Sequence, residues 1–463
     1  MRSFQRLIAS SLCLFALSQS PIWAQSSTST VQISNTQTLR VFELPGALDE
    51  QVMFNSNSPE IVQTPGILLS TLPGGPASPF LDYAFTGDFG VFTHHIAKDQ
   101  NLGDRLLYLG LLATNQSSQP VKFTIKTGAS YLSQPDALFA NLPPYADNAN
   151  ASLYAGPGDR VATEMLAGKA PMQNLEVEIP PQSTQIIYSL PVPTDVAIPP
   201  AINGRSTLMH CHSDGPVYLS HVALFAEKTA NGFIVPSLDD YRQVLDTRQL
   251  AGPREQAPPA YNPQDPPPIG GGFRYGRVAG VSQGVHWKGS LWQDTRILER
   301  PAAGQKVAYP ISAVYLKRFG TAQNQSGAML KRYPDTAYQA HGNYGVHYEL
   351  KIPLHNTTKE FQTYTFAIDQ PANMTGNAKQ AEMHYMTPPN KQVLFRGSAR
   401  MRWIDEYAQQ QDELKHLVLR SGQESAPISM ITVPPNTRYD LQLDLVYPAD
   451  VTPPQLLTIG RIE

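Results

Sequence analysis

A histidine–cysteine–histidine run, followed by one more histidine, contains the residue types in this chain best suited to chemistry. The stretch STLMHCHSDGPVYLSHVALF (206–225) holds His210, Cys211, His212 and His221. Asp-Gly pairs favour two-residue hairpin turns, so Asp214-Gly215 predicts a β-hairpin. Because side chains alternate along a strand, this hairpin would place the three histidines on one face and the cysteine on the other. Three imidazoles and a water can hold zinc or copper, which makes this a candidate metal site.

Two features of the same stretch weaken the metal hypothesis. Pro216 has no N–H to donate and can shift the register by one residue, which would split the histidines between the two faces. His210 and His221 would also be only diagonal neighbours. The alternative is that His210, His212 and His221 are polar or partly buried strand residues and that Cys211 is a small core side chain. We therefore expect no cofactor, with zinc or copper as the ion if these histidines form a site.

A second motif points to a serine nucleophile. GVSQG (280–284) matches the Gly-x-Ser-x-Gly pattern of serine hydrolases, with Ser282 in the nucleophile position. That pattern works on a strand–turn–helix elbow above a parallel sheet. Here VHWKGSLW follows, with Gly289 and alternating aromatic residues, and the βαβ pattern that builds a parallel sheet is missing. Chance in a glycine-rich chain explains the match, and a serine hydrolase remains the alternative. His94 and His95 are adjacent, so they would point to opposite faces of a strand and could not chelate together.

The loop RYPDTAYQAHGNYG (332–345) combines aromatic, amide and charged side chains, which suit the recognition of sugars or polar peptides. Trp287 and Trp292 offer similar aromatic surfaces. The candidate ligand-binding residues are Arg332, Tyr333, Asp335, His341, Asn343 and Trp287. The alternative is a structured connection whose tyrosines pack on a sheet.

The N-terminus resembles a bacterial secretory signal. Arg2 and Arg6 precede an apolar run (7–17) that is too short to span a bilayer, and Ala24 is a small residue at a suitable cleavage point. The residue before Cys13 is leucine, which is too large for a lipoprotein cleavage site. We expect removal of residues 1–24 and export to the periplasm or cell surface. An uncleaved membrane tether is the alternative.

Charge and cysteine content narrow the partners and the sources of stability. The formal net charge is −3, and loss of Arg2 and Arg6 with the signal changes it to −5. With no basic run, nucleic acid is not an expected partner. No later segment is apolar enough to predict a membrane anchor after signal cleavage. Cys211 would be the one cysteine left, so an internal disulfide is excluded and core burial must stabilise the fold.

Short alternating runs predict strands almost throughout, and two sets look alike. LYLGLLAT (107–114) and VHYELKIPL (346–354) are each followed by a polar turn and a second strand. Further along, 177–193 and 431–448 share a strand, a Pro-Pro turn and another strand. The repetition predicts a mainly β protein with two antiparallel immunoglobulin-like β-sandwich domains and a few short helices. Convergent sandwich patterns, without duplication, are the alternative.

The segment GPREQAPPAYNPQDPPPIGGG (252–272) is too rich in proline and glycine for a sheet interior, so it predicts a linker or surface strap. The expected organisation is a signal peptide (1–24), a flexible segment (25–40), a first sandwich (41–251), this linker and a second sandwich (273–463). Helices are expected at 237–252, where Ser237 and Asp240 have capping-box spacing, at 159–166, and at 405–419.

Long motifs across the chain resemble one cyanobacterial family. They include FNSNSPE (54–60), FTHHIA (92–97), YLSQPDALF (131–139), SDGPVY (213–218), RYPDTAYQAHGNYG (332–345) and YPADVTPPQLLT (447–458). The family is catalogued as domain of unknown function number three thousand three hundred and seventy. The resemblance implies a secreted or periplasmic protein and assigns no activity. His210-Cys211-His212 lies outside the family motif beside it, which argues against a metal function common to the family.

These observations favour a non-catalytic envelope protein, which binds or supports glycan, peptidoglycan or another envelope protein. The alternative is a metal-dependent or serine hydrolase of the periplasm.

Overall fold

The computed structural model describes residues 33–75, 78–98, 105–196, 198–263, 265–268 and 272–462. The predicted signal peptide (1–24) lies outside this part of the chain. The structure describes the predicted flexible segment (25–40) only from residue 33. From residue 35 onward the prediction is wrong, because these residues form a strand. Strand β1 (Asn35–Val41) lies between β16 and β22 and forms backbone hydrogen bonds with both.

The described residues form a mainly β protein with three sheets. The large, 13-stranded sheet contains β3 (Val52–Ser56), β4 (Ile61–Val62), β5 (Gly66–Ser70), β6 (Phe85–Lys98), β7 (Arg105–Asn115), β8 (Val121–Leu132), β10 (Met172–Ile179), β11 (Ser183–Val192), β12 (Ile202–Thr229), β13 (Gly232–Phe233), β14 (Ala279–Gln283), β17 (Gly327–Arg332) and β18 (Gln339–Ala340). It folds into two layers, which we call the N-terminal sandwich. Apolar side chains from both layers, among them Phe54, Phe89, Leu111 and Met209, form its core.

Two seven-stranded sheets face each other in the C-terminal sandwich. One contains β1, β16 (Lys306–Ile311), β20 (Gln362–Asp369), β21 (Asn373–Asn377), β22 (Gln380–Tyr385), β25 (Ser429–Val433) and β27 (Gln455–Arg461). The other contains β2 (Ala47–Leu48), β9 (Tyr145–Asp147), β15 (His286–Ser290), β19 (His347–Asn356), β23 (Val393–Ile404), β24 (Gln410–Arg420) and β26 (Thr437–Val446). Buried residues such as Phe366, Leu350, Leu443 and Ile459 fill the space between them.

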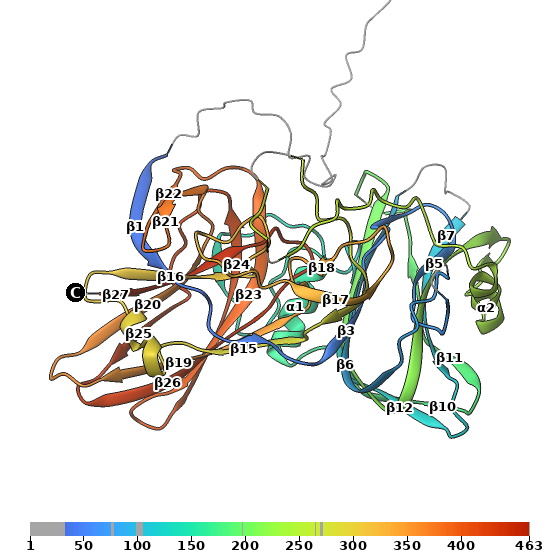
Figure 1. Ribbon diagram of the computed structural model, residues 1–463, viewed down its shortest axis with the longest axis horizontal. Coiled ribbons are helices and arrows are strands. Elements are labelled where there is room, and N and C mark those ends of the chain that lie inside the picture. Colours follow the sequence, from blue (N-terminus) through green and yellow to red (C-terminus); the bar gives the residue numbers. More distant parts are fainter. Residues whose placement is uncertain are drawn as a thin grey trace, which may run out of the picture.

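Figure 1 shows the two sandwiches side by side, with helix α1 (Pro157–Ala167) between them and α2 (Leu238–Thr247) at the outer edge of the N-terminal sandwich. The capping box predicted for α2 is present, because Ser237 and Asp240 bond each other's backbone N–H groups. The helix expected at 405–419 is wrong. Residues 410–420 form β24, since pairing with β23 overrides their helical propensity. Within the described residues, neither α-helix nor the short 3₁₀ helix (Asp294–Glu299) has the length and apolarity of a membrane span.

Strand pairing crosses the predicted domain boundary in both directions. β14 and β17, from the predicted second domain, pair within the large sheet. β2 and β9, from the predicted first domain, pair in the C-terminal sandwich. The intervening proline-rich segment begins against the large sheet, where Gly252 N–H donates to Thr64 Oγ1 at 2.9 Å. The chain therefore passes between the sandwiches several times, among them near residues 48–52 and 283–286 and on either side of β9 and of β17–β18.

The hairpin predicted at Asp214-Gly215 is wrong. β12 continues through these residues as one strand, and neither has the positive φ that a tight hairpin turn needs. Residues 202–213 pair with β6 and β8, and residues 218–227 pair with β7 in the other layer. The register shifts between Ser213 and Val217, where Pro216 has no N–H to donate. β12 therefore bends from one layer into the other.

Two asparagines occupy matching positions in the strand pairs that look alike in the sequence. Asn115, at the end of β7, and Asn356, at the end of β19, begin turns that carry the chain from one layer of each sandwich to the other. Each side-chain amide donates to the carbonyl four residues on and to two carbonyls of a distant turn. The acceptors are Gln119, Ile179 and Pro180 for Asn115, and Glu360, Val433 and Pro434 for Asn356, at 2.7–3.2 Å. Each asparagine thereby connects, through hydrogen bonds, two turns that pass between the layers of its sandwich.

We predict that Asn356→Ala destabilises the protein by about 2–4 kcal/mol, because three acceptors lose a buried donor. Chemical denaturation measures the change. Asn390→Ala is the matched control: Asn390 also accepts a turn N–H, from Gln392, but is exposed. It should change stability by less than about 0.5 kcal/mol. Equal effects of the two variants would contradict the role given to Asn356.

Candidate functional site

The structure does not bring His210, His212 and His221 together. Because β12 does not reverse, strand alternation places the even-numbered His210 and His212 on one face and His221 on the other, with Cys211. His212 lies at the surface, and its Nδ1 is 2.6 Å from Asp88 Oδ1. Cys211 is a core residue, as the alternative reading predicted, and burial raises the pKa of its thiol.

His221 belongs to a buried polar chain inside the N-terminal sandwich. Its Nδ1 is 2.9 Å from Ser56 Oγ, and the same hydroxyl is 3.0 Å from Nε2 of His95. His95 Nδ1 is in turn 2.8 Å from the Pro59 carbonyl. Burial lowers the pKa of His95 to about 3 and that of His221 well below its usual value. His94 points away from this chain and contacts Ser206, which agrees with the predicted alternation.

His210 instead meets side chains of the C-terminal sandwich. His286 lies on β15, and His347 and Glu349 lie on the adjacent β19. One nitrogen or oxygen from each of these three residues falls within 4.8 Å of the others. The His210 ring is 5.5 Å from that of His286, measured between centroids. We call these four residues the junction histidine cluster, since they come from both sandwiches.

Three atoms of the junction histidine cluster are buried without a well-formed hydrogen bond: His210 Nε2, His286 Nδ1 and Glu349 Oε2. The last two are 3.2 Å apart as an ion pair. Burial, followed by the charges of His286 and His347, lowers the pKa of His210 to about 4. The contact with His286 holds the pKa of Glu349 below its usual value.

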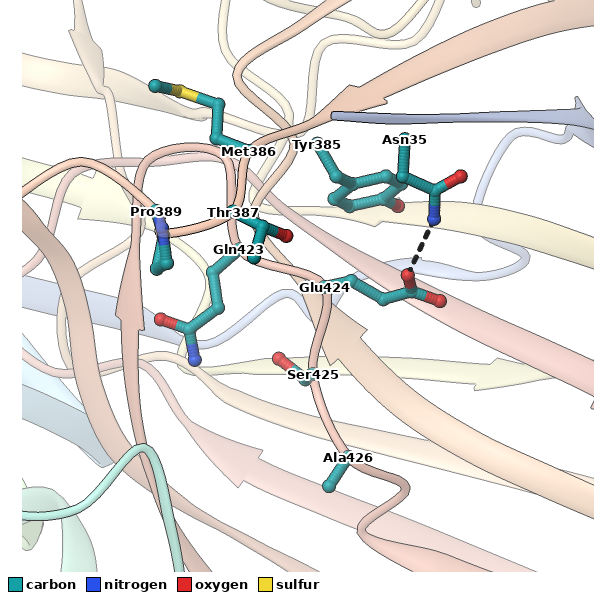
Figure 2. Close-up of a pocket in the computed structure, with 9 residues that line it drawn as sticks. All are labelled: Asn35, Tyr385, Met386, Thr387, Pro389, Gln423, Glu424, Ser425 and Ala426. Atoms are coloured by element: carbon teal, nitrogen blue, oxygen red, sulfur yellow. Dashed lines mark hydrogen bonds between the residues drawn. The ribbon is translucent and has the colours of Figure 1, made fainter. Parts of the chain in front are cut away.

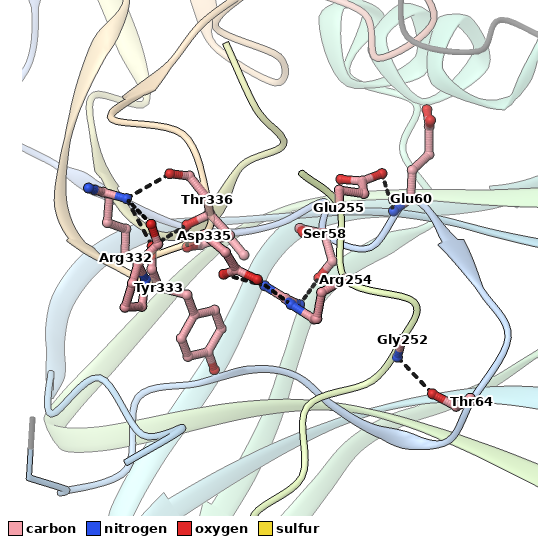
Figure 3. A network of polar contacts seen from close by, with 12 residues as sticks. Ser58, Glu60, Thr64, Gly252, Arg254, Glu255, Arg332, Tyr333, Asp335 and Thr336 are labelled. Atoms are coloured by element: carbon pink, nitrogen blue, oxygen red, sulfur yellow. Dashed lines mark hydrogen bonds and ion pairs between the residues drawn. The ribbon is translucent and has the colours of Figure 1, made fainter. Parts of the chain in front are cut away.

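The candidate recognition residues are mostly engaged in internal contacts (Figure 3). Arg332 Nη1 donates to the carbonyls of Tyr333, at 2.9 Å, and Thr336, at 2.7 Å. Tyr333 is buried, with its hydroxyl between Ser70 N–H and the Pro79 carbonyl. Asp335 accepts two bonds from Arg254, at 2.7 and 2.9 Å. These contacts hold loop 332–345 against the proline-rich segment (252–272) and the large sheet. The loop is thus a structured connection, which was the alternative interpretation of its sequence.

The other three candidates have similar internal partners. His341 Nε2 is 2.8 Å from the Gly276 carbonyl, and its ring stacks on Tyr275. Asn343 is 2% exposed and donates to the Gln325 carbonyl and the Tyr348 hydroxyl. Trp287 is 5% exposed, and its indole N–H donates to the Pro45 carbonyl at 3.0 Å. All six candidates therefore make contacts within the protein.

Ser282 lies in β14, which is paired on both sides, by β3 and β17. It is 2% exposed, so the sharp elbow that makes a serine nucleophile accessible is missing at this position. Trp292 is also buried, and its indole N–H donates to Tyr309 at 2.8 Å.

Sequence reasoning missed a pocket at the edge of the C-terminal sandwich (Figure 2). It encloses about 400 Å³. Its lining residues are Asn35, Tyr385, Met386, Thr387, Pro389, Gln423, Glu424, Ser425 and Ala426. They come from β1, the end of β22 and two loops, a combination that no local motif marks. The hydroxyls of Tyr385 and Ser425 are buried and have no hydrogen-bond partner.

A family described as "Protein of unknown function (DUF3370)" matches residues 39–461. The chain belongs to this family. No curated protein matches this DUF3370 chain. Its fold is weakly similar to the CBM22-1–CBM22-2 tandem of Paenibacillus barcinonensis Xyn10C, at 11% identity, 86% of this chain, 98% of that one and a TM-score of 0.16. The coconut allergen cocosin is 10% identical, with 88% of this chain and 86% of that chain covered and a TM-score of 0.10. Such low TM-scores carry no functional argument.

We predict that the buried chain of His95, Ser56 and His221 makes the protein sensitive to acid. These histidines are neutral when folded, but in the unfolded chain they protonate below about pH 6.5. Stability therefore falls as the pH drops from about 6.5 towards 3, by about 1.4 kcal/mol per pH unit for each histidine. Asp369 and Asp450 oppose this between about pH 6 and 4, because burial raises their pKa to about 6.

Asp369 and Asp450 affect the pH dependence of stability equally in the parent chain and in His95→Gln. The difference between the two chains therefore reports His95 alone. The slope of unfolding free energy against pH between 6.5 and 5 should decrease by about 1.1 kcal/mol per pH unit on average in this variant. Asn390→Ala, at an exposed position without a titrating group, should keep the parent slope. Urea denaturation at several pH values measures both, and an unchanged slope in His95→Gln would show that His95 titrates normally in the folded state.

Proposed function

We propose that this DUF3370 protein is an exported, non-catalytic protein of the cell envelope that binds a glycan in the pocket at the edge of the C-terminal sandwich. The observation that carries the proposal is a pocket of about 400 Å³ whose lining includes two buried hydroxyls without partners, on Tyr385 and Ser425. Pockets that fix a ligand combine apolar surface with a few placed polar groups. Here Met386 and Pro389 supply the apolar surface.

The charge of the pocket favours a neutral, hydroxyl-rich ligand. Glu424 is the one ionisable acid in the lining, and no lysine or arginine lines the pocket. Its carboxylate already accepts bonds from Lys306 and Asn35, each at 3.1 Å, and from Gln37. Lys306 thus balances its charge. A phosphate-rich ligand would lack a cationic partner, whereas sugar hydroxyls can donate to and accept from amide, carboxylate and hydroxyl groups.

Export is supported by the N-terminal sequence, with its basic start, short apolar run and Ala24. A non-catalytic role is supported by the positions of Ser282 and Cys211, which lie within sheets and away from the pocket. Binding to the envelope would then follow from recognition of a glycan, such as the sugar strand of peptidoglycan, in the compartment that contains it.

The test is binding of residues 25–463 to a glycan array and to purified peptidoglycan, with an Ala426→Trp variant. Ala426 is exposed at the pocket rim, so an indole there should block the pocket without disturbing the core. We expect at least a tenfold loss of affinity with an unchanged melting temperature. Ala230→Trp, at an exposed turn beside β13, is the matched control and should bind normally. No binding to any glycan, or equal binding by both variants, would overturn the proposal.

A further inference from the structure

We propose that the junction histidine cluster is a zinc site that joins the two sandwiches, with His210, His286, His347 and Glu349 as its ligands. This inference is independent of the pocket. It moves the metal chemistry away from His212 and His221 and towards residues of the other sandwich.

The backbone positions three of these side chains for a common ion. β15 and β19 are parallel neighbours, and His286 is in register with His347 while Lys288 is in register with Glu349. His347 and Glu349 are two residues apart, so they share a face of β19 with His286 beside them. Asp49 Oδ1 fixes the start of β15 by accepting the N–H groups of Val285, at 2.8 Å, and His286, at 3.1 Å.

The separation of the donor atoms fits a small ion. Zinc bonds to nitrogen and oxygen are about 2.0–2.1 Å, which places tetrahedral ligand atoms about 3.3 Å apart. His286 Nδ1 and Glu349 Oε2 are 3.2 Å apart, yet neither has a hydrogen bond of good geometry. The donor atoms of His286, His347 and Glu349 lie within 4.8 Å of one another, so their side chains have to rotate towards the ion to reach the tetrahedral separation of about 3.3 Å.

The fourth ligand comes from β12: His210 lies beside this group of three, and its ring has to move closer to share the ion. Its Nε2 is buried and unpartnered, and its ring lies 5.5 Å from that of His286. An unpartnered buried nitrogen costs free energy unless a donor or a metal ion satisfies it, and among the described residues no N–H or O–H group donates to His210 Nε2. A divalent cation satisfies all of these lone pairs at once.

A second layer of contacts orients the ligands. His347 Nε2 is 3.2 Å from Asp444 Oδ1, and Asp444 is 1% exposed. Arg402 holds the other oxygen of Asp444 at 2.7 Å. A carboxylate behind a metal-bound histidine is the common arrangement at zinc sites, since it fixes the ring and increases its basicity. The side chains of His286 and Glu349 are 18% and 26% exposed, which leaves a path for an ion from solvent.

The donor set selects the class of metal. Three imidazoles and one carboxylate suit zinc, with copper or nickel as competitors, and disfavour calcium and magnesium, which prefer oxygen ligands. Four protein ligands make a closed, structural site. Because His210 comes from the large sheet and the other three ligands from the C-terminal sandwich, one ion would fix the two sandwiches relative to each other.

The test uses residues 25–463 without a histidine tag, stripped by a chelator and titrated with Zn²⁺ by calorimetry, with metal analysis after dialysis. We expect one zinc per chain and a melting temperature about 3 °C higher at a hundredfold excess over Kd. His286→Asn should abolish stoichiometric binding, and His210→Asn should weaken it at least tenfold. His212→Asn, two residues along β12, is the matched control and should bind as the parent does.

Circular dichroism of each stripped variant checks that it folds, and Co²⁺ replaces Zn²⁺ as a spectroscopic probe. Visible absorption bands of tetrahedral cobalt, lost in Glu349→Gln, would support the ligand set independently of stability. The proposal is overturned if the parent chain retains no zinc, if zinc binding survives His286→Asn, or if His212→Asn reduces it as much as His210→Asn does.

Discussion

The continuity of β12 is the constraint on which the N-terminal sandwich depends. Its 28 residues pair with β6 and β8 in one layer and with β7 and β5 in the other. A strand that enters both layers must bend, and the bend falls at Ser213–Val217, where Pro216 interrupts the ladder. Strand alternation then holds on both sides of the bend. Met209, Cys211 and Leu219 enter the core, and His210 faces the C-terminal sandwich.

The crossovers between layers need a different solution, because they place backbone carbonyls in the interior, where an unpaired polar group is costly. Asn115 and Asn356 solve this in the same way, each with one buried amide that satisfies three carbonyls. The two sandwiches therefore share a local device although their strand orders differ. The hydrogen-bonding capacity of one side chain explains why asparagine occupies both positions.

The features that were predicted correctly from the sequence are those that depend on neighbouring residues. The mainly β class, the strands around Asn115 and Asn356, and the cap of α2 at Ser237 all follow from alternation, turn residues and capping. The hairpin at Asp214-Gly215 was wrong because a local turn signal competed with the pairing of β12 to five other strands. The helix at 405–419 was wrong for the same reason, since cross-strand contacts such as Arg400 with Asp412 stabilise β24. The junction histidine cluster could not be found in this way, because His210 and His286 are distant in sequence and meet through tertiary packing.

The two histidine groups on either face of β12 differ in how their nitrogen atoms are used. In the inward group, His95 has both nitrogens beside oxygen partners, Pro59 and Ser56, and His221 has Ser56 and Tyr188. No nitrogen there is left for a metal, and the chain serves as internal hydrogen bonding within an apolar core. In the outward group, His210 Nε2 has no hydrogen-bond partner, and its ring lies 5.5 Å from that of His286, which forms an ion pair with Glu349. Burial alone cannot explain this difference, because both groups are largely enclosed; the difference lies in which donors and acceptors the surrounding strands provide.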